Sequence, residues 1–141
     1  MKNITAIIVL IFFSSAIKAQ LIIGQPLKDG IKIIKKEKYI LTSAGSIQKA
    51  KTVAFDGRSF DVTLDSNGFV KNVFTSDTTF VTENNIKIGM AFKDIKDNLL
   101  LQSYLYQPGW AKYYLAKAGW KIAFAFDSEI TDTSRVQFIF K

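Results

Sequence analysis

The feature that most constrains the fold is a series of short runs in which apolar and polar side chains alternate, separated by turn signals. The run at 58–64, RSFDVTL, follows an Asp-Gly pair at 56–57, which is typical of a two-residue hairpin turn because both residues tolerate a positive φ. The DSNG segment at 65–68 indicates a second turn, before a run at 69–75. Three antiparallel strands are therefore predicted between residues 49 and 75.

The second half of the chain repeats this order. Alternating runs occur at 109–115 (GWAKYYL), 120–126 (WKIAFAF) and 135–140 (RVQFIF). In the last two runs the large apolar side chains share one side of the strand, which predicts that Trp120 is a core residue. A further linking strand is predicted at 78–84, TTFVTEN.

Two segments that lie 65 positions apart share a pattern: LIIGQPLKDGI at 21–31 and IKIGMAFKDIK at 86–96. Apolar residues recur at helical spacing from each, so the segments PLKDGIKIIKKEK and AFKDIKDNLLLQ are predicted to be helices. In the second helix, Phe92 and Leu99 are expected in the core, while Lys93 and Lys96 are expected at the surface.

These patterns predict an α+β fold. A helix on a three-strand meander buries too little area by itself, so two such units are expected to share a sheet or a core. We therefore expect one mature domain, 20–141, made of two tandem helix-plus-three-strand repeats at about 20–76 and 77–141.

Residues 1–19 are typical of a secretory signal peptide, with Lys2 at a short positive start, an apolar run, and Ala19 before the expected cleavage site. The alternative is an uncleaved anchor, but the run is short for a membrane span. The mature protein is expected to begin at Gln20, to be periplasmic or secreted, and to have no stable membrane insertion.

The chain has no histidine and no cysteine, which excludes thiol nucleophiles, Ser-His-Asp triads and most zinc or copper sites. Oxygen-rich segments at 65–68 and 127–132 lack the ligand spacing of a calcium loop, so we interpret them as ordinary turns. No Gly-rich phosphate loop occurs. We therefore expect no metal, no cofactor and no catalytic residues.

Basic residues outnumber acidic ones. Without Lys2 and Lys18, 17 basic and 12 acidic residues leave a net charge of +5, and most of the excess lies between Lys28 and Lys51. Such a face suits an acidic protein, an anionic lipid surface or nucleic acid, although it also suits a solvated helix surface. Export argues against nucleic acid, which we do not expect as a partner.

The segment IKIGMAFKDIK, together with the aromatic strands and the terminal RVQFIF, resembles the exported α/β repeats of the beta-lactamase-inhibitor-protein-like and outer-membrane-assembly-lipoprotein (SmpA/OmlA) superfamily. The residues that match its helix-opening pattern are Gly89, Met90, Asp94 and Ile95. Ala91 replaces the usual hydroxyl, and Pro26 and Gly30 depart from the pattern in the first copy.

This resemblance implies a binding or inhibitory module with no catalytic residues to carry over. The lipid-bearing cysteine of the assembly lipoproteins is missing, which puts a membrane-assembly role in doubt. The leader and its KAQ end resemble those of secreted proteins from the Bacteroidetes.

The stretch 103–120, SYLYQPGWAKYYLAKAGW, is rich in Tyr and Trp, which are over-represented at binding hot spots. The alternative is that most of these rings pack in the core. We expect the helices to cover one sheet face and the other face to be free, with Lys121, Ala123 and Ala125 as its floor. The predicted partner-binding residues are Tyr104, Tyr106, Trp110, Tyr113 and Lys121.

The leading functional hypothesis is an exported, non-enzymatic protein-binding module, with inhibition of a secreted enzyme or neutralisation of a toxin as its specific forms. One alternative is an envelope-associated structural or assembly protein. A second alternative is a carboxylate-based hydrolase, which requires two acids converging in a pocket.

Overall fold

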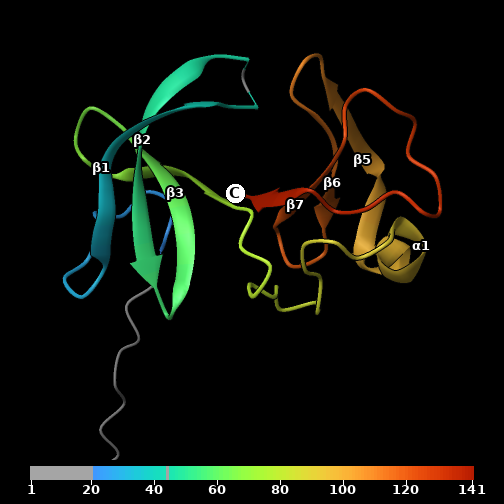
Figure 1. Ribbon diagram of the computed structural model, residues 1–141, viewed down its shortest axis with the longest axis horizontal. Coiled ribbons are helices and arrows are strands. Elements are labelled where there is room, and N and C mark those ends of the chain that lie inside the picture. The colour runs from blue at the N-terminus through green and yellow to red at the C-terminus, as the bar shows by residue number, and fades with distance from the viewer. Residues whose placement is uncertain (1–20, 44) are drawn as a thin grey trace, which may run out of the picture.

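One antiparallel sheet of eight strands makes up most of the molecule (Figure 1). The computed structural model describes residues 21–43 and 45–141, so the predicted signal peptide and its cleavage site lie outside the described residues. The elements are β1 (Lys32–Leu41), β2 (Ile47–Phe55), β3 (Arg58–Leu64), β4 (Val70–Thr75), α1 (Phe92–Ile95), the 3-10 helix η1 (Lys96–Asn98), β5 (Leu99–Gln107), β6 (Ala111–Ala116), β7 (Lys121–Phe124) and β8 (Phe138–Phe140).

Two meanders of four strands form this sheet, in the order β1-β2-β3-β4-β8-β7-β6-β5. Strands β1–β4 make the first meander and β5–β8 the second. They join where β4 pairs with β8, with Phe74 opposite Phe140 and Thr75 opposite Ile139. In Figure 1 the first meander is on the left and the second on the right, with the C-terminus between them. The two edges of the sheet are β1 and β5.

The predicted α+β fold of two helix-plus-three-strand repeats, about 20–76 and 77–141, is wrong. Each half contributes four strands, and α1 and η1 together are the helical part of the described residues. The expected linking strand at 78–84 is reduced to a single bridge between Val81 and Lys87. In the described part of the chain, no helix has both the length and the apolar character needed to cross a membrane.

The first predicted helix is instead a turn followed by the edge strand β1. Gly30 has a φ of 93°, which is incompatible with an α-helix, and β1 pairs with β2 from Lys32 opposite Ala54 to Leu41 opposite Ile47. The helical spacing of apolar residues is therefore overridden by tertiary strand pairing. The second predicted helix is real but short, because the chain becomes extended again at Leu99.

The alternating runs predicted most of the strands correctly. Those at 49–55, 58–64, 69–75, 109–115, 120–126 and 135–140 are confirmed, with shifted ends, as β2, β3, β4, β6, β7 and β8. The predicted hairpin turn at 56–57 is also confirmed, since Asp56 and Gly57 both have positive φ, 49° and 71°. At the next turn, the Asp65 carboxylate accepts hydrogen bonds from the backbone N–H groups of Asn67 and Phe69.

The two echo segments, 21–31 and 86–96, make matching backbone contacts although they are not both helices. The Gly24 N–H donates to Val70 O (2.8 Å), and the Val70 N–H donates to Gln25 O. In the same way, the Gly89 N–H donates to Val136 O (2.9 Å), and the Val136 N–H returns to Met90 O. Both glycines have a positive φ, 79° and 85°. The shared pattern thus clamps each segment to its own meander.

The main core lies on one side of the sheet, the first face, which carries Phe60 and Val62. The side chains that cover this face come from 21–31, the 76–98 connection and the 126–137 loop. Leu99 and Trp120 are buried there as predicted, and Lys93 and Lys96 are exposed. Phe92 is only half-buried, at the margin of this core.

A smaller aromatic cluster lies on the opposite side, the second face, which carries Asp61 and Phe74. Its buried members are Phe74, Ala111, Tyr113, Ala123 and Phe140, with Ile40, Trp110 and Phe138 packed against them. The expected free floor of Lys121, Ala123 and Ala125 is therefore wrong: Ala123 is fully buried, and the other two are half-buried. Because both faces of the sheet bury side chains, apolar and polar residues do not alternate regularly along its central strands.

Candidate binding groove

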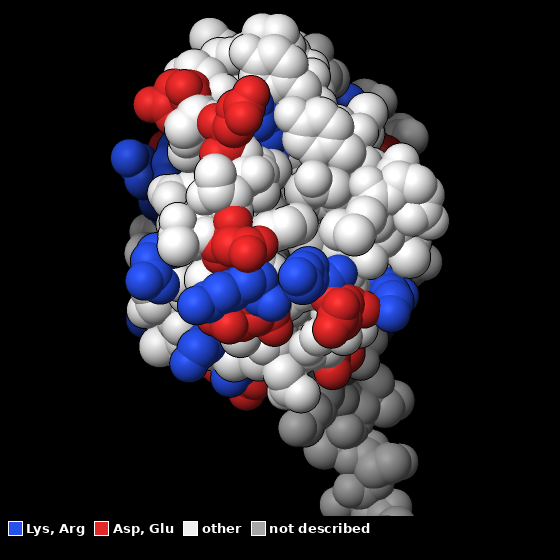
Figure 2. Space-filling model, turned by 90° about the vertical axis from the view of Figure 1, so that its right-hand side faces the viewer, with Lys and Arg blue, Asp and Glu red and all other residues white. Residues whose placement is uncertain are grey.

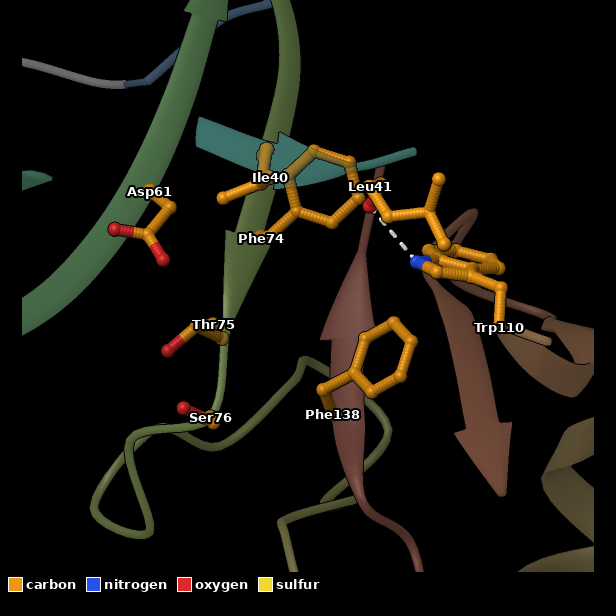
Figure 3. A pocket seen from close by; sticks show the side chains of 8 residues that line it. All are labelled: Ile40, Leu41, Asp61, Phe74, Thr75, Ser76, Trp110 and Phe138. Carbon is orange, nitrogen blue, oxygen red and sulfur yellow. Dashed lines mark hydrogen bonds between the residues drawn. The ribbon is translucent and has the colours of Figure 1, made fainter. Parts of the chain in front are cut away.

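A groove on the second face runs between the β1–β2 hairpin and the strands β6 and β8. Its apolar end is a cavity of about 240 Å³ (Figure 3). Phe74, Trp110 and Phe138 face one another across this end, while Asp61, Thr75 and Ser76 lie toward the other side in Figure 3. Ile40 and Leu41 of the hairpin complete the lining.

Trp110 ties the two halves of the molecule together at this groove. Its indole Nε1–H donates to the backbone oxygen of Leu41 at 2.8 Å, across 69 positions of the chain. Its ring packs edge-on against Phe138 and Phe140, with centroids 5.0 and 4.9 Å away. Buried indole N–H groups need such a partner, and this one fixes the hairpin over the second face. The wall of the groove is therefore held in place before any partner arrives.

The polar end of the groove is a second cavity of about 220 Å³, and the two cavities share Asp61, Phe74, Thr75 and Ser76. Asp61 is engaged there. Its carboxylate accepts from Lys38 Nζ at 2.6 Å and from the Thr52 hydroxyl at 2.7 Å. Both partners are partly exposed, so the pair contributes roughly 1 kcal/mol or less to stability. Its main effect is to hold a charged group at a defined position.

Asp77 lines the same polar end and is also fully engaged. Its carboxylate accepts from the Ser59 N–H, the Thr79 N–H and the Thr79 hydroxyl, at 2.9, 2.9 and 2.6 Å. The Thr79 hydroxyl bond, then the backbone bonds, hold the pKa of Asp77 below the ordinary value of an aspartate. A carboxyl group with a lowered pKa is a poor proton donor. The presence of both Asp61 and Asp77 at the polar end of the groove therefore does not favour acid–base catalysis.

Three of the predicted partner-binding residues gather on the second face: Trp110, Tyr113 and Lys121. Trp110 is half-buried and lines the groove. Tyr113 is buried beneath it, 5.8 Å from the Trp110 ring, and burial raises the pKa of its hydroxyl. The Lys121 Nζ lies 5.3 Å from the Phe140 ring. Only Trp110 among them is placed to touch a ligand in the groove.

The other two predicted residues, Tyr104 and Tyr106, lie away from the groove on the first-face side of β5. Tyr104 packs on Tyr114, with ring centroids 5.3 Å apart, and Tyr106 lies under the Lys112 ammonium at 5.5 Å. Both tyrosines are exposed. The five residues therefore do not border one surface, and a role for this pair in partner contact stays a prediction.

Sequence reasoning missed most of the residues that line the groove. Ile40 and Leu41 follow the segment 26–38 that was predicted to be a helix, and no partner contact was predicted for them or for Phe138. A usable signal was present at 73–74, where adjacent Val and Phe in one strand predict that both sheet faces bury apolar side chains.

A larger cavity, about 560 Å³, lies on the first face and is mostly apolar. Inside it the Trp120 Nε1–H donates to Glu83 at 3.0 Å, and the Lys141 ammonium lies 4.4 Å from the Trp120 ring. Part of its wall is Leu21–Ile23, which adjoins residues outside the described part of the chain. We therefore place the candidate site in the groove, whose walls are all described.

Acidic residues do not converge into a metal site. Within 21–43 and 45–141, no group of three or more Asp or Glu side chains is arranged to hold an ion. Asp65 caps its own turn, which is the structural role predicted for that segment. What the groove offers chemically is aromatic surface, hydroxyl groups and two fixed carboxylates.

Comparison with known proteins supports the fold and goes no further. No protein-family model matches the chain, and no curated protein matches it. One similar solved structure is the crystal structure of the uncharacterized protein yfeY from Escherichia coli. It has a TM-score of 0.59 and 15% sequence identity, over 87% of this chain and 93% of that chain. At this identity the likeness concerns the fold alone.

Proposed function

We propose that the chain is an exported, non-enzymatic protein-binding module that holds a segment of another protein in the groove of the second face. The observation that carries this proposal is the open aromatic end formed by Phe74, Trp110 and Phe138, next to the hydroxyl groups of Thr75 and Ser76. Aromatic side chains on a rigid support supply contact area at a low entropic cost.

Each end of the groove is large enough for one side chain of a partner. The apolar end has a volume of about 240 Å³ and the polar end about 220 Å³. A large aliphatic or aromatic side chain of the partner would fill the apolar end. Neighbouring polar groups of the partner would then meet Ser76 and the Asp61–Lys38 pair.

The engaged state of the two carboxylates favours binding over the hydrolase alternative. Asp61 is paired with Lys38, and Asp77 accepts three hydrogen bonds that lower its pKa. Neither is left free to activate water. Inhibition of an enzyme or neutralisation of a toxin remains the specific form of binding that we propose, in the periplasm or outside the cell.

Selection from a displayed library of random peptides tests this function. The protein is recovered after export, and enrichment of peptides with one large apolar side chain is expected. Ser76 is exposed and lines both cavities, so Ser76→Trp should fill the groove and abolish the enrichment. Thr78→Trp is the matched control, since Thr78 is exposed and lies outside the lining. Enrichment that survives Ser76→Trp, or no enrichment at all, would contradict the proposal.

Export itself is tested by the mass of the recovered protein. We expect the loss of residues 1–19, which leaves Gln20 as the first residue. A full-length mass in the membrane fraction would contradict both cleavage and the proposed localisation.

A further inference from the structure

The net positive charge of the described chain is confined to one segment. Residues 28–51, which include β1 and the first half of β2, hold seven lysines and two acidic residues, a net charge of +5. The remaining described residues hold ten basic and ten acidic side chains and are neutral overall. Within this segment Lys38 and Lys49 are in ion pairs, whereas Lys35 and Lys36 are exposed and make no ion pair with a described residue.

The same hairpin carries two of the most exposed large apolar side chains of the described residues, Ile47 (73% exposed) and Tyr39 (63%). Strand register puts them on one side. Tyr39 is opposite Lys49, and Leu41 is opposite Ile47. Tyr39, Lys49 and Ile47 belong to the first-face side, beyond the segments that cover the core, whereas Leu41 lines the groove. We call Tyr39, Ile47, Lys49 and Lys51 the hairpin patch.

The opposite side of this hairpin is already occupied. Ile40 packs into the aromatic cluster, and the Leu41 backbone accepts the indole hydrogen bond of Trp110. In Figure 1 the β1–β2 hairpin bends at the top of the first meander toward the second meander. The hairpin is therefore an arm that is fixed on its inner side and presents the hairpin patch on its outer side.

Protection of the sheet edge explains only part of this arrangement. Lysines on an edge strand discourage pairing with other chains, which accounts for the charge on β1. Protection of the edge does not account for the exposed side chains of Tyr39 and Ile47, since apolar side chains on an edge hairpin promote association between protein chains. Lysines around an apolar tip are instead the chemistry of peripheral membrane contact, in which apolar groups enter the interface and cations meet anionic headgroups.

We propose that the β1–β2 hairpin docks on an anionic lipid surface, with Tyr39 and Ile47 entering the interface and the exposed lysines of 28–51 facing the headgroups. These lysines lie before and along the edge strand β1 and on β2. That distribution suits a broad charged plane better than the shaped acidic site of one protein. The site is separate from the groove, because it uses the outer side of the hairpin.

Sedimentation with vesicles tests this docking. Protein recovered after export, with its first residue identified by mass, is mixed with vesicles of phosphatidylcholine alone or of phosphatidylcholine with phosphatidylglycerol. Binding is expected only to the anionic vesicles, and it should weaken as salt is added. Each surface lysine is worth about fivefold in affinity, so Lys35→Gln with Lys36→Gln should lower binding about 25-fold.

Matched variants distinguish docking by the hairpin from a general electrostatic attraction between the protein and the vesicles. Lys93→Gln with Lys96→Gln removes the same charge from α1 and η1, far along the chain, and should lower binding much less. Ile47→Ser should lower binding about tenfold. Leu101→Ser, at an exposed apolar position on the other edge strand, should have almost no effect.

A fluorescent probe locates the contact. The chain has no cysteine, so Ser46→Cys at the hairpin tip can carry an environment-sensitive dye, with Thr78→Cys as the control. The dye at 46 should shift to the blue on anionic vesicles, and the dye at 78 should not. Absence of vesicle binding overturns the proposal. The proposal is also overturned if the protein binds heparin as tightly as anionic vesicles and Ile47→Ser does not weaken that binding. The site would then recognise soluble polyanions.

Discussion

The two halves of the molecule use the same clamp but end in different edge strands. Gly24 and Gly89 make matching hydrogen bonds to Val70 and Val136, and each clamp leads into the edge of its own meander. The first edge, β1, is lysine-rich, and its residues 32–37 are all exposed. The second edge, β5, has no charged residue, and its register against β6 shifts between Leu100 and Leu105.

This difference shows two ways of handling a free sheet edge. The register of β1 against β2 also shifts, and its charge discourages edge-to-edge pairing as well, whereas the uncharged β5 has only its irregular register to break the ladder that another strand would need. In β5 the Ser103 hydroxyl replaces part of that ladder, since it donates to Leu100 O and accepts from the Leu115 N–H. Figure 2 shows charged side chains across the lower half and the upper left of the β5 side, while most of the upper right of that face is uncharged.

The largest expected effect on the free energy of unfolding distinguishes two residues that occupy equivalent positions after the matching segments 21–31 and 86–96. Leu99 is 4% exposed and Ile34 is 58% exposed, although they lie 65 positions apart in matching segments. Leu99→Ala should lower the free energy of unfolding by about 2–5 kcal/mol, because it leaves a cavity in the main core. Ile34→Ala should change it by about 0.5 kcal/mol or less. Denaturant unfolding measures both, and equal losses would break the comparison between the halves.

A smaller effect should be shared by both halves. Gly24→Ala and Gly89→Ala each place a side chain at positive φ, where a Cβ meets no neighbouring atom. The cost is then backbone strain alone, about 1–2 kcal/mol in each case. Thermal unfolding of the two variants checks this. If only one of them is destabilised, the clamps are not equivalent.

The smallest effect concerns the end of the first meander, which Asp77 anchors to Ser59. The folded-state pKa of Asp77 lies below its unfolded value, so its ionised form stabilises the fold above the unfolded pKa. This contribution is lost as the pH falls through the folded pKa. Asp77→Asn should therefore lower stability at neutral pH, by less than about 1 kcal/mol because the group is solvent-accessible, and weaken the acid dependence of the urea midpoint. An unchanged acid profile would contradict the assigned role.

Local patterns predicted the strands well and the helices poorly. β3 and β7 could be predicted because their large apolar side chains lie on the first face and therefore recur at every second position, as Ile122 and Phe124 do in β7. The helix at 26–38 could not be excluded in this way, since Leu27, Ile31 and Ile34 also fit a helical period. The segment forms a strand because it pairs with β2. The spacing of apolar residues within one segment does not show which other strand that segment contacts.

The groove was less predictable than the strands, for the same reason. Trp110 was expected to bind a partner and does line the groove, but part of the wall comes from Ile40 and Leu41 of β1, the strand that begins within the segment predicted to be a helix. Tyr113 was expected at the surface because the second face was expected to be free. It is buried because its ring packs against Trp110 and Phe140, in a cluster that Ile40 also joins.

The two indole N–H groups allow the most direct test of the binding groove. The chain has two tryptophans, Trp110 in the groove and Trp120 in the core of the first face. Their nitrogen–proton NMR signals can be followed while a peptide selected from the library is added, with Trp110→Phe used to assign the signals. Binding in the groove predicts that the Trp110 signal moves and the Trp120 signal stays. Movement of the Trp120 signal with an unchanged Trp110 signal would contradict the account.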